Sequence, residues 1–106
     1  MNVKIVSEAK ADFANLLTYY VNVGNYEGNY DLARRFEAEI LQAFSFIKEF
    51  PNASKLLYKN RIRAYHLNRF PVSVVYEQKS DCILVLSIYD QRRNPNFLKD
   101  RIDTTA

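Results

Sequence analysis

The sequence has few of the residues that mark specialised chemistry: one cysteine, one histidine and two glycines in 106 residues. The cysteine, Cys82, lies inside an apolar run, so no disulfide framework is possible and we expect a reducing, cytoplasmic setting. No metal-ligand spacing, glycine-rich phosphate loop or hydrolase nucleophile elbow occurs, so we expect no metal and no cofactor. No signal peptide precedes the first apolar segment, and no window approaches the roughly 18 apolar residues of a membrane-spanning helix.

What is present indicates one folded domain that covers residues 1–106. Hydrophobic residues make up 48% of the chain and charged residues 25%, with eight tyrosines and seven phenylalanines. This composition is typical of globular proteins and unlike that of disordered chains. A chain of this length is expected to build a single core.

The net charge of +3 is unevenly distributed along the chain. Residues 1–53 contain five Lys/Arg and seven Asp/Glu, a net charge of −2. Residues 54–106 contain ten Lys/Arg and five Asp/Glu, a net charge of +5. The basic second half predicts an anionic partner, either nucleic acid or an acidic protein segment.

The first half predicts a strand followed by a helix. Asn2–Val6 alternates in polarity, as a short strand does. Ser7 is the expected N-cap, because its hydroxyl can accept a hydrogen bond from a free amide of the first helical turn. Gly24 and Asn25 are the expected helix stop. The apolar stripe of this helix consists of Ala9, Phe13, Leu16, Leu17 and Tyr20.

A second amphipathic helix is expected after the turn-like pair Gly28 and Asn29. Pro51 ends it, because proline disfavours the helical conformation of the residue before it. The two helices should pack as an antiparallel pair. The apolar face of the second helix consists of Leu32, Phe36, Ile40, Ala43, Phe44, Ile47 and Phe50.

From Lys55 onward the pattern is that of strands joined by short turns. The continuously apolar run Cys82–Tyr89 predicts a strand in the interior of the sheet. The other strands are expected at Leu56–Lys59, Arg61–Asn68 and Val72–Glu77. We therefore predict an α+β fold of order β-α-α-β-β-β(-β). An N-terminal helical hairpin packs on a small antiparallel meander, and a short C-terminal helix begins at Pro95.

A group of short motifs in the second half resembles one known superfamily. These motifs are Arg63, Phe70-Pro71 leading into Val74-Val75-Tyr76, the strand end Tyr89-Asp90-Gln91-Arg92-Arg93-Asn94-Pro95, and Arg101. Together with the element order they resemble the RelE/ParE superfamily of bacterial toxins from type II toxin–antitoxin modules, with the ParE branch most similar. That branch often carries a histidine before the x-Arg-Arg step, where this chain has Asp90.

The resemblance to the ParE branch implies a protein that binds and poisons DNA gyrase without chemistry of its own. Such a toxin inhibits growth and serves plasmid stabilization. It needs shape and charge on an exposed surface. The candidate target-binding residues are Arg63, Arg69, Arg92, Arg93 and Arg101.

The RelE branch implies the alternative of a ribosome-dependent mRNA endonuclease. There a ribose 2′-hydroxyl attacks its own phosphate, which requires a base, an acid and fixed cations. Arginines are plentiful, whereas a general base is scarce. The candidates for the base are Tyr65, His66, Tyr89 and Asp90. The candidate catalytic residues for this activity are Arg63, His66, Tyr89, Asp90, Arg92 and Arg93.

Strand alternation separates His66 from the arginines of its own strand. One face of this strand carries Arg61, Arg63 and Tyr65, and the other carries Ile62, Ala64 and His66. We interpret His66 as a core or helix-facing residue, with a catalytic histidine as the alternative. This placement favours the ParE-like function.

Arg92 and Arg93 stand where the most buried strand leaves the sheet. Such a position directs at least one of them toward a concave face, where it can meet phosphate or an acidic partner. The other interpretation is that one arginine pairs with Asp90 or Asp100 and the other is solvated.

The resemblance also implies a cognate antitoxin that wraps the domain in a hetero-oligomer. Apolar residues left over on the outer helix faces, Tyr19, Val23, Leu41 and Phe46, predict a groove for an amphipathic helix. Alternatively they complete the core or form a homodimer. An inactive relative that retains only antitoxin binding is the remaining functional alternative.

Overall fold

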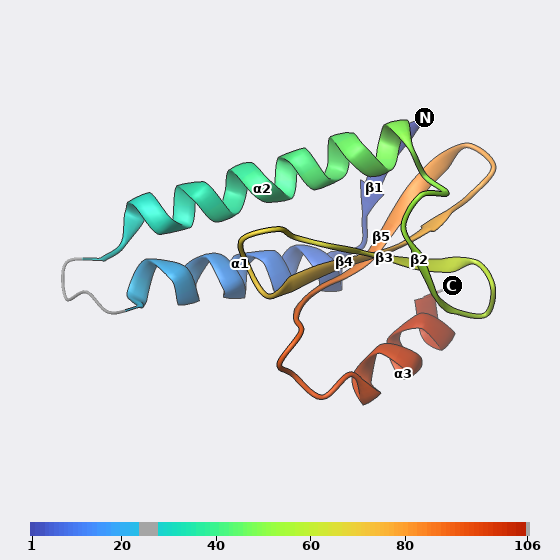
Figure 1. Cartoon of the computed structure of the whole chain (residues 1–106). Helices are drawn as coiled ribbons and strands as arrows, with labels where there is room; N and C mark the ends of the chain where they lie inside the picture. Colours follow the sequence, from blue (N-terminus) through green and yellow to red (C-terminus); the bar gives the residue numbers. More distant parts are fainter. Residues whose placement is uncertain (24–27, 106) are drawn as a thin grey trace.

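A computed structural model of the chain describes residues 1–23 and 28–105 (Figure 1). Within these residues there are five strands and three helices. In chain order they are β1 (Asn2–Ile5), α1 (Ser7–Asn22), α2 (Tyr30–Glu49), β2 (Lys55–Tyr58), β3 (Ile62–His66), β4 (Val72–Gln78), β5 (Cys82–Asp90) and α3 (Asn96–Thr105). The predicted α+β order is confirmed.

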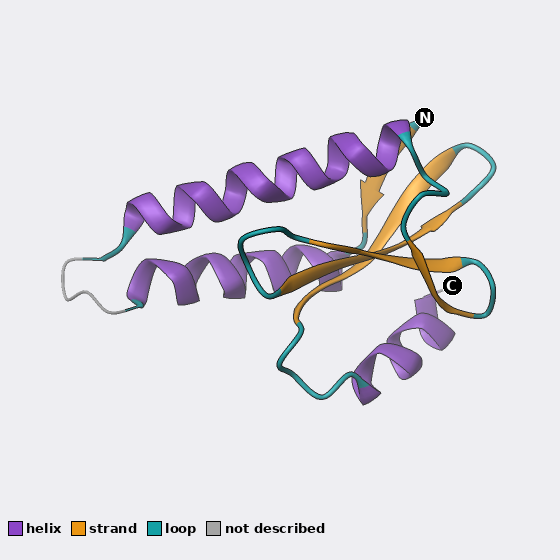
Figure 2. Ribbon diagram, viewed as in Figure 1, coloured by secondary structure: helices purple, strands orange, loops and turns teal. Residues whose placement is uncertain are grey.

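The five strands, drawn in orange in Figure 2, form one mixed sheet. Their order in the sheet is β1-β5-β4-β3-β2. Strands β2 to β5 are the expected antiparallel meander. Strand β1 adds to it in parallel with β5, from the pair Asn2↔Cys82 to the pair Ile5↔Val85. The apolar β5 is therefore an interior strand, as its sequence predicts.

The sheet separates two hydrophobic layers. The antiparallel hairpin of α1 and α2 lies on one face and α3 on the other (Figure 1). Successive side chains of β4 point to opposite faces of the sheet, so the strand contributes to both layers: Val72 and Val74 pack on the hairpin side and Val75 on the α3 side. Strand β4 thus buries side chains on both faces of the sheet, whereas the edge strand β2 has no fully buried residue.

The starts of the two long helices differ from each other. Ser7 is the first residue of α1 and not its cap, because the cap position falls on Val6, the residue that leaves β1; the prediction of a Ser7 cap is wrong. Asn29 caps α2, and its Oδ1 accepts a hydrogen bond from the amide of Leu32 at 3.2 Å. The expected helix stop at Gly24 and Asn25 lies outside the described residues.

The end of α2 also departs from expectation. The predicted apolar stripe is correct up to Ile47, but Phe50 follows the last helical residue and is 49% exposed. The next turn begins one residue earlier than expected, because β2 ends at Tyr58 and both Lys59 and Asn60 have φ near +58°, as in tight hairpin turns.

None of the helices in residues 1–23 and 28–105 is long and apolar enough to cross a membrane.

Candidate functional site

The site lies where β5 extends beyond the end of its short neighbour β1. Pairing with β1 ends at Val85, and beyond it α1 lies along β5. The register of β5 against β4 shifts between Val75 and Tyr76, so β5 carries a bulge at Leu86–Ser87. The bulge turns polar groups of β5 toward α1.

Asp12 on α1 occupies the place of a strand partner for this part of β5. Its Oδ2 accepts hydrogen bonds from the Ser87 hydroxyl at 3.2 Å and from the Ile88 amide at 3.1 Å. Arg101 of α3 donates to the same carboxylate, with Nη1 2.5 Å from Oδ2. One aspartate therefore ties α1, β5 and α3 together at the base of the site.

Between α1 and the end of β5 there is an open cleft of about 320 Å³, which we call the arginine cleft. Helix α1 contributes Asp12, Asn15 and Tyr19, and the end of β5 with the following turn contributes Tyr89, Asp90, Arg92 and Arg93. A hydrogen bond from the Arg93 amide to the Asp90 carbonyl, at 3.0 Å, closes that turn. The turn holds both arginines at the rim of the cleft.

Arg92 is oriented by Asp90. The Arg92 Nε lies 2.9 Å from Oδ1 of Asp90, and Nη2 lies 2.5 Å from Oδ2, a two-point contact between guanidinium and carboxylate. The hydrogen bond from Arg92 holds the pKa of Asp90 below its ordinary value, whereas Asp90 and then the Tyr19 hydroxyl raise the pKa of Arg92. The Arg92 side chain is nevertheless 63% exposed. It is a fixed cation that remains open to a ligand.

Arg93 is oriented by an aromatic ring instead of an acid. Its guanidinium carbon lies 3.6 Å from the centre of the Phe97 ring. The Phe97 ring meets Tyr89 edge-on at 5.8 Å, and the Arg101 guanidinium lies 5.2 Å from the same ring. The expectation that one arginine pairs with Asp90 describes Arg92, while Arg93 packs on Phe97.

Arg101 lies beneath the cleft in a nearly buried ion pair. The Arg101 side chain is 17% exposed and that of Asp12 is 10% exposed. Its charge is satisfied within the fold.

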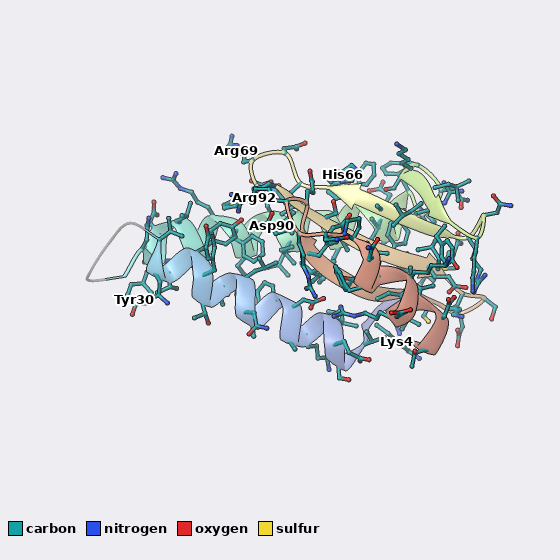
Figure 3. The ribbon with its side chains drawn as sticks, turned by 90° about the horizontal axis from the view of Figure 1, so that it is seen from below. Lys4, Tyr30, His66, Arg69, Asp90 and Arg92 are labelled. Atoms are coloured by element: carbon teal, nitrogen blue, oxygen red, sulfur yellow. The ribbon has the colours of Figure 1, made fainter. Side chains whose placement is uncertain are left out.

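The loop between β3 and β4 lies beside the end of β5. The Gln91 amide donates to the Pro71 carbonyl at 2.7 Å, which joins the two segments. In the same loop the amides of Asn68 and Arg69 both donate to Oε1 of Glu39, at 3.1 Å. The exposed Arg69 therefore lies at the same end of the sheet as Arg92 (Figure 3).

His66, Ser73 and Tyr89 form a row across three neighbouring strands, because His66 is paired with Ser73 and Ser73 with Tyr89. The His66 Nδ1 lies 2.5 Å from the Ser73 hydroxyl and 3.4 Å from Gln91 Nε2. As predicted, His66 shares the face of Ile62, but it is exposed; the expectation of a core histidine is wrong because α3 does not cover this end of the strand.

The arginines and the tyrosine on the other side of β3 do not reach the arginine cleft. Arg63 donates to the Ser54 carbonyl at 2.7 Å. Tyr65 packs against Phe46 of α2, with ring centres 5.2 Å apart. Arg61 precedes the strand and pairs with the buried Glu77 at 3.1 Å.

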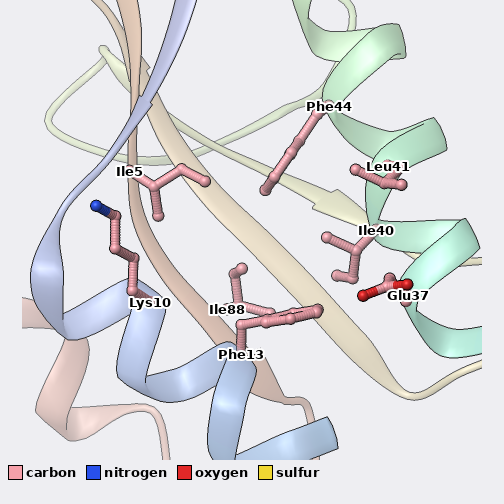
Figure 4. Close-up of a pocket in the computed structure, with 8 residues that line it drawn as sticks. All are labelled: Ile5, Lys10, Phe13, Glu37, Ile40, Leu41, Phe44 and Ile88. Atoms are coloured by element: carbon pink, nitrogen blue, oxygen red, sulfur yellow. The ribbon is translucent and has the colours of Figure 1, made fainter. Parts of the chain in front are cut away.

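The four residues expected to form one antitoxin groove lie on separate surfaces. Tyr19 borders the arginine cleft, and Phe46 packs over β3. Val23 follows the end of α1. Leu41 lines a different pocket of about 240 Å³ between α1, α2 and the sheet (Figure 4). The described pockets and contacts therefore do not bring these residues together in one groove.

The pocket beside Leu41 is almost entirely apolar. Phe13, Ile40, Phe44 and Ile88 project into it from both helices and from β5 (Figure 4). Lys10 and Glu37 stand at its rim, and Leu41 is 59% exposed, among the most exposed large apolar residues described. We call this the hairpin pocket.

Sequence reasoning missed Asp12, Asn15 and Phe97. The first two stand three residues apart on α1, with Tyr19 four residues later, so helical spacing alone could have indicated a polar stripe. Phe97 stands four residues after Arg93, but their contact crosses the turn that starts α3. The structure shows no group of three or more potential metal ligands in residues 1–23 and 28–105.

Comparisons with known proteins found one matching family and a solved structure of the same fold. The family described as "ParE toxin of type II toxin-antitoxin system, parDE" matches residues 3–95. A solved chain of the chromosomal ParDE TA system from P. aeruginosa superposes with a TM-score of 0.71 at 21% identity, covering 85% of this chain and 95% of that one. At this identity the similarity shows a shared fold. No curated protein matches the chain significantly.

Proposed function

Because this chain belongs to the family of ParE toxins of type II toxin–antitoxin systems, we propose that it inhibits bacterial growth by binding and poisoning DNA gyrase. A cognate antitoxin neutralises it in a toxin–antitoxin hetero-oligomer. The poison acts by occupying a surface of its target and needs no reaction of its own.

The observation that supports this proposal most is the pair of oriented, exposed cations at the rim of the arginine cleft. Arg92 is held by Asp90 and Arg93 by Phe97, so neither side chain has to be ordered on binding. Arg69 extends the same basic surface from the neighbouring loop. Arg63 and Arg101 are assigned to the fold in this proposal, because they already bond Ser54 and Asp12.

The test is a gyrase assay with charge-reversed variants. Arg92→Glu and Arg93→Glu should each abolish the accumulation of cleaved DNA by purified gyrase, because repulsion replaces attraction at the contact. Arg34→Glu, an exposed arginine on α2, is the matched control and should retain wild-type potency. Circular dichroism verifies that each variant is folded. Full potency of both cleft variants would contradict the proposal.

A second candidate function is ribosome-dependent mRNA cleavage, and the His66–Ser73–Tyr89 row favours it. The row places an exposed imidazole and a phenol on one face, near Gln91. General acid–base groups are worth about 10²–10⁴ in rate. If the protein cleaves mRNA, His66→Ala or Tyr89→Phe should reduce cleavage on ribosomes by such a factor. Intact mRNA with the wild-type protein excludes this activity.

The hairpin pocket is the surface that we propose for the antitoxin. It is apolar, it is open, and its rim carries one charge of each sign on Lys10 and Glu37. Leu41→Asp should weaken antitoxin binding and leave toxicity intact, whereas Leu57→Asp, an exposed leucine on β2, should affect neither. Equal antitoxin affinity of the wild-type and Leu41→Asp proteins would contradict this assignment. A folded protein that binds antitoxin but is harmless would instead be an inactive relative.

A further inference from the structure

We propose that the arginine cleft binds single-stranded DNA, with a phosphate held by Arg92 and Arg93 and a base against the ring of Tyr19. This proposal extends the proposed gyrase function and rests on it, because gyrase supplies the cut DNA that the cleft would bind. The binding itself is a property of this chain alone and can be measured without gyrase.

The phosphate side of the cleft consists of two guanidinium groups that are anchored in different ways. Asp90 contacts the edge of Arg92 formed by Nε and Nη2, and the side chain is 63% exposed. The Arg93 guanidinium lies over the Phe97 ring at 3.6 Å, which leaves the N–H groups at its rim for hydrogen bonds. A guanidinium matches the oxygens of a phosphate with two parallel donors.

The charge balance of the cleft favours an anion. Asp12 is paired with Arg101, and Asp90 is paired with Arg92. Arg93 has an aromatic partner and no acidic one among the described contacts, so the cleft carries a net positive charge. A phosphodiester supplies one negative charge at each linkage.

Aromatic and amide groups stand directly beside these cations. Tyr19 is 49% exposed and lines the same cleft as Arg92. The half-buried Tyr89 and the amide of Asn15 also line the cleft, together with Leu16 and Ile88. Stacking of bases on tyrosine next to backbone cations is how proteins bind single strands without sequence preference. Duplex DNA hides its base faces, so this arrangement favours unpaired nucleotides.

The cleft can hold a small ligand, and its lining favours a nucleotide over an acidic side chain. Its volume of about 320 Å³ is at the lower end of the roughly 300–1,000 Å³ typical of ligand pockets. A glutamate side chain would satisfy the guanidinium groups but leave the tyrosine and the amide without a ligand. A nucleotide would place its phosphate on the guanidinium groups and its base on the tyrosine and the amide.

The test is fluorescence anisotropy with a labelled twelve-nucleotide single strand of mixed sequence and the full-length protein. Arg93→Gln should weaken binding about tenfold by removing a phosphate contact, and Tyr19→Leu severalfold by removing a stacking face. Arg34→Gln is the matched control and should bind as the wild type does. Affinity should fall as salt is raised.

Competition identifies the ligand class. The same sequence as a duplex and a twelve-residue polyglutamate should each compete more weakly than the single DNA strand. Equal or stronger competition by either of them overturns the assignment to single-stranded DNA. So does unchanged binding in both cleft variants, or no binding by the wild-type protein.

Failure of this inference is distinguishable from failure of the gyrase function. If the wild-type protein traps cleaved DNA on gyrase but binds no single strand, the function stands and the DNA site is wrong. If it binds the single strand as described but has no effect on gyrase, the site stands and the gyrase function is wrong.

Discussion

At the scale of single residues, the arginine cleft shows how a small chain keeps cations both exposed and ordered. Asp90 and Arg92 are two residues apart, and their contact fixes a side chain that would otherwise lose rotamer freedom on binding. Arg93 obtains the same rigidity from Phe97 without neutralising its charge. The two arginines are therefore not equivalent, and we expect Arg93 to be the stronger attractor of anions.

The Asp90–Arg92 contact predicts a pH dependence with a definite sign. Arg92 lowers the pKa of Asp90 in the folded state, while the unfolded value stays near about 3.9. The contact therefore favours the folded state above about pH 4, and this contribution is lost as the pH falls through the folded pKa. NMR titration should show an Asp90 midpoint below the ordinary value, and Arg92→Gln should raise it. An unchanged midpoint in that variant would refute the coupling.

The buried Asp12–Arg101 pair predicts that the losses in the free energy of unfolding caused by two single substitutions do not add up in the double variant. Asp12→Ala leaves a mostly buried guanidinium without its acid, and we expect a loss of about 3 kcal/mol in the free energy of unfolding. Arg101→Leu should cost less in the Asp12→Ala background than in the wild type, because the charge to be removed is already unpaired. Urea unfolding measures both. Strictly additive losses would mean that the pair contributes nothing specific.

At the scale of elements, the two helix starts show why a cap cannot be assigned from residue type alone. Ser7 is a favourable cap residue, but β1 ends so close to the helix that the position before Ser7 becomes the cap. Asn29 follows Gly28, whose φ is +89°, and its side chain reaches the amide of Leu32. The sequence pattern is similar in both places, and the preceding element decides the outcome.

This difference predicts unequal effects of two substitutions to alanine. Asn29→Ala should lower the free energy of unfolding by about 1 kcal/mol, because it removes the hydrogen bond to the Leu32 amide. Ser7→Ala should change it by no more than about 0.5 kcal/mol, since the bond that the Ser7 hydroxyl makes among the described residues is to the exposed side chain of Glu8. Thermal or urea unfolding of the two variants compares them directly. Equal losses would indicate that Ser7 also caps its helix in solution.

At the scale of the whole molecule, the sequence predicts what depends on local periodicity and misses what depends on remote contacts. The helical hairpin and the interior position of β5 follow from apolar patterns in the chain. The parallel pairing of β1 with β5 does not, because a four-residue strand contains no information on its partner. The Asp12–Arg101 pair spans 89 residues and leaves no local signal.

The candidate site follows the same division. Arg92 and Arg93 were predicted from their position at the end of a strand, and Asp90, the partner of Arg92, from its proximity in sequence. The α1 side of the cleft was missed, since it depends on where the bulge in β5 turns its polar groups. His66 was misplaced for a related reason, because burial of its strand end depends on how far α3 extends.

The central claim is that this ParE-family chain acts on DNA gyrase through the arginine cleft. Its most direct test is controlled induction in bacteria, with DNA synthesis and protein synthesis followed separately by pulse labelling over the first minutes. We predict an early block of DNA synthesis with induction of the DNA-damage response while translation continues, and no such block with Arg93→Glu. An early collapse of translation with cleaved mRNA, while DNA synthesis continues, would contradict the account.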